Sequence, residues 1–505
     1  MKNNRNYNWP AEKYGTLMNI DTDALIYFSR VYNGDLSDIE NKCNDYFERY
    51  VNSGISDLIY NIDGNVPTDT CEWRGDFYTR KEERGVAVDY SENEGIKILW
   101  RVYKESYVDP YSIWLSRAWD SGMRPWLSFR MNDVHYANEP TGHSEFFYKA
   151  KDNGWMVGDY HSPTSWYGYA LDYSVPEVRE HYLAIISALT QKYDAFGIDL
   201  DFHRTIRCFK QLDESNSKYM TEFLRSVDKI RKQAEEKWGH PWRIMIRLCQ
   251  SVELAHKYGF DIETLVAEKL ADAFVPASYW GSTDNAIPIW EWKRICPKDI
   301  PIFWGIECHT VNFRHLINAD AVAGYMLTAN ASGADGMYQF NTFGAPWAWR
   351  LGTVEEAYKV PVRRFLTTQN DFKVVNYNEY EPHYFPIRVS PDVAAEHKMT
   401  VGALKDDEDI LVFVGVDPEE KGEKLRVFFN GKETKPIGKS GKSYMEKYFA
   451  DFYEEQKMGR YPWRIYTYRV PKAACEGMEG VATLNFVCPE ECNVYYAEIA
   501  NGNIE

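Results

Sequence analysis

The sequence predicts an α/β chain: a (β/α)8 TIM barrel at residues 1–360, followed by a smaller antiparallel β-sandwich at residues 361–505. Eight short apolar runs alternate with helical segments in the first part of the chain, which is the pattern of a closed parallel barrel. No G-x-G-x-x-G turn follows the first run, which disfavours an open dinucleotide-binding sheet. At 505 residues, the chain has room for a barrel of about 250 residues and a second domain.

The predicted barrel strands are short and almost continuously apolar, as strands buried on both faces are. In chain order they are residues 24–28 (ALIYF), 57–61 (DLIYN), 125–129 (PWLSF), 196–201 (FGIDLD), 244–248 (IMIRL), 273–278 (AFVPAS), 302–306 (IFWGI) and 336–340 (GMYQF). The strands and their helices place the barrel at about residues 15–360.

Helical signals lie between these runs. Residues 174–191 begin with an S-x-x-E capping box formed by Ser174 and Glu177. Apolar residues then follow at spacings of three and four, and a second stripe follows the fourth run: Val178, Tyr182, Ile185 and Leu189; Tyr219, Phe223, Val227 and Ile230. Asp261 is expected to cap a further helix that ends before residue 273.

After residue 360 the pattern changes to a period of two with frequent turns. The predicted strands are residues 409–416, 425–429, 464–470, 482–487 and 493–499, and an Asn-Gly turn follows the second of them. Short strands at regular spacing with such turns favour an antiparallel β-sandwich.

The charge balance excludes some partners. The chain has 58 Lys and Arg against 75 Asp and Glu, a formal net charge of -17, which repels nucleic-acid phosphates and anionic membrane surfaces. Aromatic residues make up 16% of the chain, including 17 Trp and 37 Tyr, and flat amphipathic rings suit sugars as well as core packing. We therefore expect an oligosaccharide as partner, no nucleic acid and no membrane, and a homo-oligomer is compatible with the sequence.

The sequence shows no secretory leader and no run of 18 apolar residues, so we expect a cytoplasmic protein. Its nine cysteines form no C-x-x-C pair and have no histidines at zinc spacing, which favours reduced thiols. Cys488 and Cys492 are only four residues apart, so a thiol pair or half of a metal site stays an alternative for these two cysteines. No cofactor is expected.

The strongest site signal is the pair Asp199 and Asp201 at the end of the fourth run. Residues two apart in a strand point to the same face, so both carboxyl groups emerge together. Burying two carboxyl groups side by side is costly unless they are paired, hydrogen-bonded or functional. This pair is therefore a candidate active site.

In a barrel of this type the chemistry lies at the carboxyl ends of the strands and on the loops that follow them. The polar and aromatic residues predicted there as substrate contacts are Arg130, Asn132, Asp133, His135, Tyr160, His161, Trp166, His203, Arg204, Arg247, Tyr279, Trp280, His309, Gln339 and Asn341. Glu307 ends the seventh run, across the barrel mouth from the fourth.

Asp201 and Glu307 match the two carboxyl groups that flank the scissile bond in glycoside hydrolysis. The sequence predicts Asp201 and Glu307 as the two catalytic carboxyl groups and Asp199 in support, in an exo-acting enzyme. The stereochemical outcome stays open until the carboxylate separation is known. Glu307 has an alternative role as an ion-pair partner of Arg247 or Arg130.

Three other interpretations stay open. The first is a barrel lyase or hydrolase that depends on a metal, with Asp133, Asp199 and His203 as a candidate metal site. The second is a barrel that binds carbohydrate without catalysis. The third concerns the arginines in and after the strands, which either pair with internal carboxylates or recognise an anionic or modified sugar.

The segment LDYSVPEVREHYLAIISALTQKYDAFGIDLDFHR resembles the region around the fourth strand in uncharacterised barrels related to glycoside hydrolase family 10. The similarity continues through Arg247, FDIETLV and VPASYW and covers roughly residues 126–347. It implies a retaining glycosidase with the acid/base after the fourth strand, at Asp201, and the nucleophile at the end of the seventh, at Glu307. Family 10 enzymes carry Asn-Glu where this chain has Leu200-Asp201, which leaves the identity of the acid/base open.

GIDLDF is also similar to the D-G-x-D-x-D-x-E strand of family 18 chitinases, with Asp199 and Asp201 matching the second and third acids. His203 stands where that motif has its catalytic Glu, and Phe196 where it has its first Asp. The chitinase mechanism is therefore disfavoured.

Overall fold

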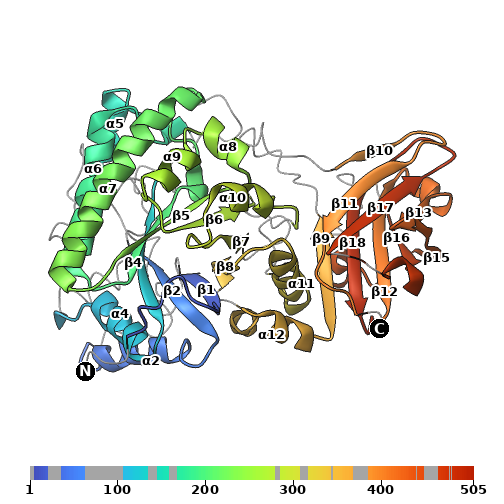
Figure 1. Cartoon of the computed structure of the whole chain (residues 1–505), viewed down its shortest axis with the longest axis horizontal. Helices are drawn as coiled ribbons and strands as arrows, with labels where there is room; N and C mark the ends of the chain where they lie inside the picture. Colours follow the sequence, from blue (N-terminus) through green and yellow to red (C-terminus); the bar gives the residue numbers. More distant parts are fainter. Residues whose placement is uncertain are drawn as a thin grey trace.

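The computed structural model describes residues 5–20, 36–62, 106–134, 145–158, 168–278, 285–307, 317–342, 345–367, 385–405, 407–439, 441–448, 464–476, 478 and 480–504. Within them, eight parallel strands pair in chain order and close into a barrel, with β1 hydrogen-bonded to β8. Antiparallel sheets follow, so the predicted fold class is confirmed (Figure 1).

The barrel strands are β1 (Thr16–Ile20), β2 (Ile55–Asn61), β3 (Arg124–Arg130), β4 (Gly197–Asp201), β5 (Arg243–Cys249), β6 (Ala273–Ala277), β7 (Phe303–Glu307) and β8 (Gly336–Phe340). Seven match the predicted runs, but the first prediction was wrong. The first barrel strand is Thr16–Ile20, and residues 24–28 lie outside the described residues. The apolar pattern did not reveal this strand, because Thr16 and Asn19 are polar. Their hydrogen-bond partners, Trp349 O and the Tyr338 hydroxyl, come together with them only in the closed barrel.

Helices surround the barrel, with α5, α6 and α7 together along one side in Figure 1. They are α2 (Ile39–Glu48), α4 (Pro110–Asp120), α5 (Glu145–Asp152), α6 (Pro176–Lys192), α7 (Ser217–Trp238), α8 (Val252–Lys257), α9 (Ile262–Ala267), α10 (Ile289–Ile295), α11 (Ala319–Ala331) and α12 (Val354–Lys359). Short 3-10 turns lie at η5 (His203–Thr205), η6 (Glu214–Asn216) and η8 (Pro346–Arg350).

The two predicted helix starts differ in outcome. Asp261 caps α9 as predicted, because its side chain accepts a hydrogen bond from the backbone N–H of Thr264. The capping box before α6 is wrong: Val175 occupies the N-cap position, and the Ser174 hydroxyl donates to Asp172 instead. The Ser174 hydroxyl, which the capping-box motif would direct to the start of the helix, is hydrogen-bonded to the Asp172 carboxylate in the preceding loop.

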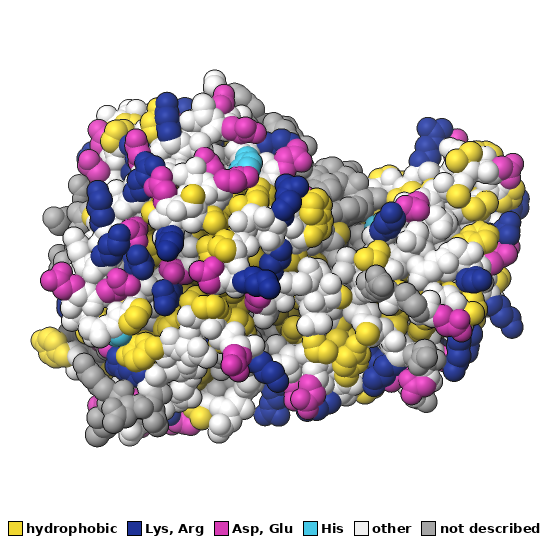
Figure 2. Space-filling view, viewed as in Figure 1, with side chains coloured by type: hydrophobic (Ala, Val, Ile, Leu, Met, Phe, Trp, Pro, Cys, Tyr) yellow, Lys and Arg dark blue, Asp and Glu magenta, His cyan; other side chains and the backbone are white. Residues whose placement is uncertain are grey.

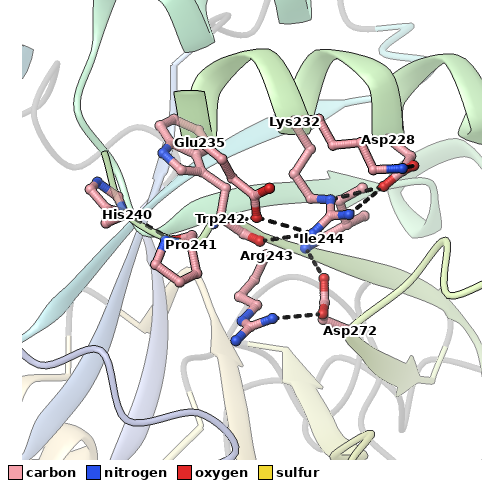
Figure 3. A network of polar contacts seen from close by, with 10 residues as sticks. Asp228, Lys232, Glu235, His240, Pro241, Trp242, Arg243, Ile244 and Asp272 are labelled. Atoms are coloured by element: carbon pink, nitrogen blue, oxygen red, sulfur yellow. Dashed lines mark hydrogen bonds and ion pairs between the residues drawn. The ribbon is translucent and has the colours of Figure 1, made fainter. Parts of the chain in front are cut away.

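A polar network fixes the amino end of β5 (Figure 3). Asp272 accepts hydrogen bonds from the backbone N–H of Ile244, at 2.9 Å, and from Arg243, at 3.3 Å. Glu235 of α7 accepts from the backbone N–H of Trp242 at 3.0 Å. These contacts anchor the start of β5 to α7 and to the residue before β6. In its pairing with β4, Arg243 lies opposite Gly197 at one end and Arg247 opposite Asp201 at the other.

The sheets after the barrel contain β9 (Val362–Thr367), β10 (Ile387–Val389), β11 (Ala395–Thr400), β12 (Ile410–Asp417), β13 (Arg426–Phe429), β14 (Lys432–Glu433), β15 (Lys435–Lys439), β16 (Arg464–Arg469), β17 (Val481–Val487) and β18 (Cys492–Gly502), with α13 (Tyr444–Tyr448), η10 (Glu419–Glu423) and η11 (Lys472–Ala474). One sheet has the order β10-β18-β12-β16-β15, with β9 also paired to β18, and the other has the order β11-β17-β13-β14. The predicted Asn430-Gly431 turn joins β13 to β14, with both residues at positive φ.

Lys, Arg, Asp and Glu side chains are interspersed over the face shown in Figure 2. Exposed ion pairs of the described residues include Arg225–Glu268 and Lys257–Glu253. Among the described residues, no helix is long and apolar enough to cross a membrane.

Candidate active site

A single buried arginine joins the two carboxylates predicted to be catalytic. Arg247 of β5 donates from Nη1 to Asp201 Oδ2 of β4 at 3.0 Å, and from Nη2 to Glu307 Oε1 of β7. All three side chains are buried, with exposed fractions of 5% or less. Asp201 also accepts from the backbone N–H of His203 at 3.0 Å. The structure therefore brings Asp201 and Glu307 to one cation, Arg247, and pairing with this arginine is the alternative role that the sequence left open for Glu307.

The Arg247 guanidinium is a permanent cation in this setting. Burial on its own lowers its pKa, but the Asp201 and Glu307 carboxylates raise it above the usual value. Its guanidinium also lies over the Phe340 ring, with the guanidinium carbon 4.1 Å from the ring centroid. An arginine held this firmly keeps its two carboxylate partners in fixed positions.

Asp199 lies deeper in the barrel than Asp201 and is fully buried. Its Oδ2 accepts hydrogen bonds from Ser128 Oγ of β3 at 2.6 Å and from the Tyr338 hydroxyl of β8 at 3.1 Å. Tyr338 in turn accepts from Asn19 Nδ2 of β1 at 2.8 Å. Four strands thus supply a polar layer beneath the Arg247 contacts.

The Asp199 carboxyl group has a pKa well above its ordinary range. Burial, and then the charge of Asp201, raise its pKa to about 7, against the hydrogen bonds from Ser128 and Tyr338 and the charge of Arg247. A carboxyl group with this pKa exchanges a proton near neutral pH, which suits general acid/base work.

The loop after β3 holds a second ion pair. Arg130 Nη1 donates to Asp133 Oδ2 at 3.0 Å, both side chains are buried, and the Arg130 guanidinium lies 5.8 Å from the Phe340 ring centroid. Arg130 pairs in register with Asp201, so the two arginines flank the β4 carboxylates. In both cases an internal carboxylate accepts from the arginine, which is one of the two roles that the sequence left open for these arginines.

Several other residues predicted to contact substrate are instead hydrogen-bonded to the backbone of nearby loops. The Asn132 side chain bonds the backbone of Leu171 and Arg207, and Gln339 bonds Ala348 O and the Thr342 hydroxyl. His203 Nε2 is 2.6 Å from Ser278 O, and Asn341 takes a positive φ of 57° directly after β8. These residues shape the loops around the mouth.

The remaining predicted contacts lie outside the described residues: His135, Tyr160, His161, Trp166, Tyr279, Trp280, His309 and the side chain of Arg204. They stay predictions. Among the described residues, no group of three His, Cys, Asp or Glu side chains is arranged to hold a metal ion, so Asp133, Asp199 and His203 do not gather as a metal site.

Asn19, Ser128, Tyr338 and Phe340 were not predicted from the sequence as part of the site. Asn19 was missed because the first strand was misplaced, and Ser128 because it lies inside a predicted strand instead of at its end. Tyr338 and Phe340 belong to the apolar pattern of β8. The signal that could have found them is strand parity, since Ser128 pairs with Asp199 across β3 and β4.

Comparisons with known proteins give structural neighbours only. No family model and no curated protein matches the chain. Solved structures similar to it include α-L-fucosidase isoenzyme 2 from Paenibacillus thiaminolyticus, with 11% identity and a TM-score of 0.42 over 70% of this chain and 51% of that one. The PgaB (BpsB) glycoside hydrolase domain from Bordetella bronchiseptica has 9% identity and a TM-score of 0.37, over 68% of this chain and 99% of the domain.

A Group IV chitinase from Ostrinia furnacalis has 12% identity and a TM-score of 0.32, over 58% of this chain. This chain spans 66% of the length of that chitinase chain, just under two thirds. These neighbours are glycoside hydrolases by name, but at such identities and TM-scores the likeness carries no argument about activity. The fold rests on the strand pairing described above.

Proposed function

We propose that the chain is a glycoside hydrolase that cleaves an O-glycosidic bond of an oligosaccharide. The observation that carries the proposal is the convergence of Asp199 and Asp201 of β4 with Glu307 of β7 at one end of the barrel, around Arg247. Buried carboxyl groups are costly, and carboxyl groups gathered in one barrel mouth are what this reaction uses.

The roles follow from the partners. Arg247 pairs with both Glu307 and Asp201, and a cation beside Glu307 favours the ionised form that a nucleophile requires. The proton that the leaving group needs therefore belongs to the Asp199–Asp201 pair as a unit, and Asp199 is the member with the raised pKa. The sequence predicted Asp201 as acid/base with Asp199 in support and left open which of the two holds the proton.

In the proposed reaction Glu307 attacks the anomeric carbon while the glycosidic C–O bond breaks. The electron pair of that bond goes to the leaving oxygen, which takes the proton of the Asp199–Asp201 pair. Water then attacks the anomeric carbon, displaces Glu307 and returns a proton to the pair. The sugar gains the water oxygen, and the enzyme recovers its starting state.

The geometry bounds the stereochemistry. The bonded oxygens of Asp201 and Glu307 contact neighbouring nitrogens of one planar guanidinium, so they lie within about 8 Å of each other. Both the retaining separation of about 5 to 5.5 Å and the shorter inverting separations fall within this bound. Retention and exo action remain part of the proposal, and the internal pairing of Arg130 and Arg247 favours an uncharged sugar over an anionic one.

The test is hydrolysis of an aryl-glycoside panel, with and without EDTA, by the wild-type chain, Glu307→Gln and Asp201→Asn. We expect hydrolysis that survives EDTA and falls about a thousandfold in both variants. Glu268→Gln is the matched control, because it removes the charge of a carboxylate that pairs with an arginine at the surface. Loss of activity in EDTA would support the metal-dependent alternative, and full activity in Glu307→Gln would exclude Glu307 as nucleophile.

A second candidate function is carbohydrate binding without catalysis. It is favoured by Arg247, which engages both carboxylates that hydrolysis would use. Calorimetric titration with oligosaccharides separates the two functions: binding without hydrolysis of any panel member supports the second, and turnover excludes it.

A further inference from the structure

The four side chains Asn19, Ser128, Asp199 and Tyr338 form a closed ring of hydrogen bonds, which we call the β-barrel polar ring. Asn19 Nδ2 donates to Tyr338 and lies 3.4 Å from Ser128 Oγ, and both hydroxyls donate to Asp199 Oδ2. All four are fully or almost fully buried. The sequence alone predicted no role for Asn19, Ser128 or Tyr338.

The donor directions in this ring are fixed. An amide nitrogen can only donate, so the Tyr338 hydroxyl accepts from Asn19 and its single hydrogen goes to Asp199. Ser128 directs its hydrogen to the same Oδ2 oxygen, at 2.6 Å. Two O–H donors therefore occupy Asp199 Oδ2, and a proton placed on that oxygen would face both of them.

The other oxygen of Asp199 is different. Among the described residues, Oδ1 has no hydrogen-bond partner, although it is fully buried. It is the oxygen that can carry a proton without meeting another donor.

We infer that Tyr338 and Ser128 are positioning residues that place the proton shared by Asp199 and Asp201 on Asp199 Oδ1. This inference rests on the proposed glycoside hydrolysis and deepens it. Asn19 supports the arrangement by orienting the Tyr338 hydroxyl. The ring does not touch the glycosidic bond in this scheme; it determines which carboxyl oxygen holds the proton that the reaction consumes.

Charged and titratable groups face Asp199 from several strands. Asp201 lies on its own strand, Arg247 on β5 and Tyr338 on β8, and each changes the energy of the ionised carboxyl group. Arg130 on β3 lies opposite Asp201, and Glu307 on β7 lies opposite Phe340. Arg130 and Glu307 are therefore closer to the carboxyl ends of the strands than Asp199 and Tyr338 are. Burial and the Asp199 charge raise the pKa of Tyr338 well above its usual value, so Tyr338 stays a neutral donor.

The first experiment measures the protonation of Asp199 directly and does not depend on catalytic activity. In protein labelled with carbon-13 at the aspartate carboxyl carbons, the Asp199 signal is assigned by its absence in Asp199→Asn and titrated with pH. We expect a midpoint near neutral pH in the wild-type chain. In Tyr338→Phe we expect it to rise by about one pH unit, because a hydrogen bond to the ionised carboxylate is lost.

Tyr468→Phe is the matched control, since the buried hydroxyl of this β16 residue donates to Gly422 O of η10 and Leu425 O, far from Asp199 in the sequence. It should leave the Asp199 midpoint unchanged. Ser128→Ala is the second variant, with the same upward direction expected, and it keeps the test decisive if Tyr338→Phe does not fold. An Asp199 midpoint at ordinary carboxyl pH, or equal midpoints in Tyr338→Phe, Ser128→Ala and Tyr468→Phe, overturns the inference.

The second experiment is the pH profile of kcat/KM for hydrolysis. Activity should fall as the Asp199–Asp201 pair loses its proton, and Tyr338→Phe should move this alkaline limb upward by the same amount as the carbon-13 midpoint. A limb that stays in place while hydrolysis continues overturns the inference and leaves the proposed function standing. Absence of hydrolysis from the whole panel, with the carbon-13 shift present, instead overturns the proposed function.

Discussion

At the scale of single residues, Arg247 organises the site. Its guanidinium contacts carboxylates from two different strands and lies over the Phe340 ring, all in a buried setting. Removing one member of a buried ionic group leaves the others as uncompensated charges, which costs far more than an exposed ion pair is worth. Arg247 therefore matters for stability as well as for the charge of Asp201 and Glu307.

Arg247→Met should lower the free energy of unfolding by about 3 to 5 kcal/mol at neutral pH, because Asp201 and Glu307 lose the buried cation that joins them. Arg225→Met, which breaks an exposed pair with Glu268, should change the free energy of unfolding far less, because water and salt already screen that pair. Urea unfolding of both variants checks the difference. Equal losses would mean that Arg247 is not an electrostatic partner of the two carboxylates.

Asp199 makes stability depend on pH in a defined direction. Its folded-state pKa of about 7 lies above the unfolded value of about 3.9, so the folded chain holds the extra proton between these values. The contribution of Asp199 to the free energy of unfolding is therefore complete below about pH 4 and is lost as the pH rises through about 7. In Asp199→Asn this component should disappear, which urea unfolding at a series of pH values can measure against the wild-type curve.

At the scale of elements, β1 and the start of α6 are the two places where the local sequence pattern predicted the structure wrongly. Thr16–Ile20 is a barrel strand although Thr16 and Asn19 are polar, because Thr16 donates to Trp349 O and Asn19 donates to Tyr338, both more than 300 residues away. Ser174 missed its role as a cap because Asp172 competes for the hydroxyl. The apolar runs of β2 to β8 needed no such partners and were predictable.

The contact between α11 and β9 depends on a glycine. A Cβ atom at Gly324 of α11 would lie 1.9 Å from the Arg364 carbonyl oxygen of β9, a distance that forces the two elements apart. Gly324→Ala should therefore reduce the free energy of unfolding by about 1 to 3 kcal/mol, despite the better helix propensity of alanine.

Gly441→Ala is the control for that change, because a Cβ atom added there would meet no described atom within 4 Å and the φ of Gly441 lies outside the left-handed region. Thermal unfolding of the two variants tests the contact. An unchanged Tm in Gly324→Ala would show that α11 and β9 do not approach so closely.

At the scale of the whole molecule, a buried ionic group connects the barrel helices to the C-terminal sheets. Arg364 of β9 donates to Glu498 of β18 and, at 3.2 Å, to Asp320 of α11. Glu498 also accepts from the Tyr496 hydroxyl at 2.6 Å and from the backbone N–H of Tyr444 at 2.8 Å. Residues before and after position 360, the predicted domain boundary, thus belong to one polar network.

Glu498→Gln should destabilise the chain by about 3 kcal/mol, because Arg364 loses its most buried carboxylate. The barrel and the sheets should still unfold in one calorimetric transition, since Asp320 and the close contact at Gly324 remain. Glu433→Gln, in an exposed pair with Arg426, should change little. A split into two transitions in the wild-type chain would contradict this coupling.

The sequence by itself determined the barrel, the strands β2 to β8, the C-terminal antiparallel strands and the position of Asp199, Asp201 and Glu307 at strand ends. These follow from apolar periodicity and strand parity, which act over a few residues. Only the tertiary structure decided that Arg247 joins Asp201 to Glu307, that Asn19, Ser128 and Tyr338 surround Asp199, and that β1 begins at Thr16. Each of these depends on hydrogen bonds or charges between strands far apart in the chain, and their strength comes from burial that exists only once the barrel has closed.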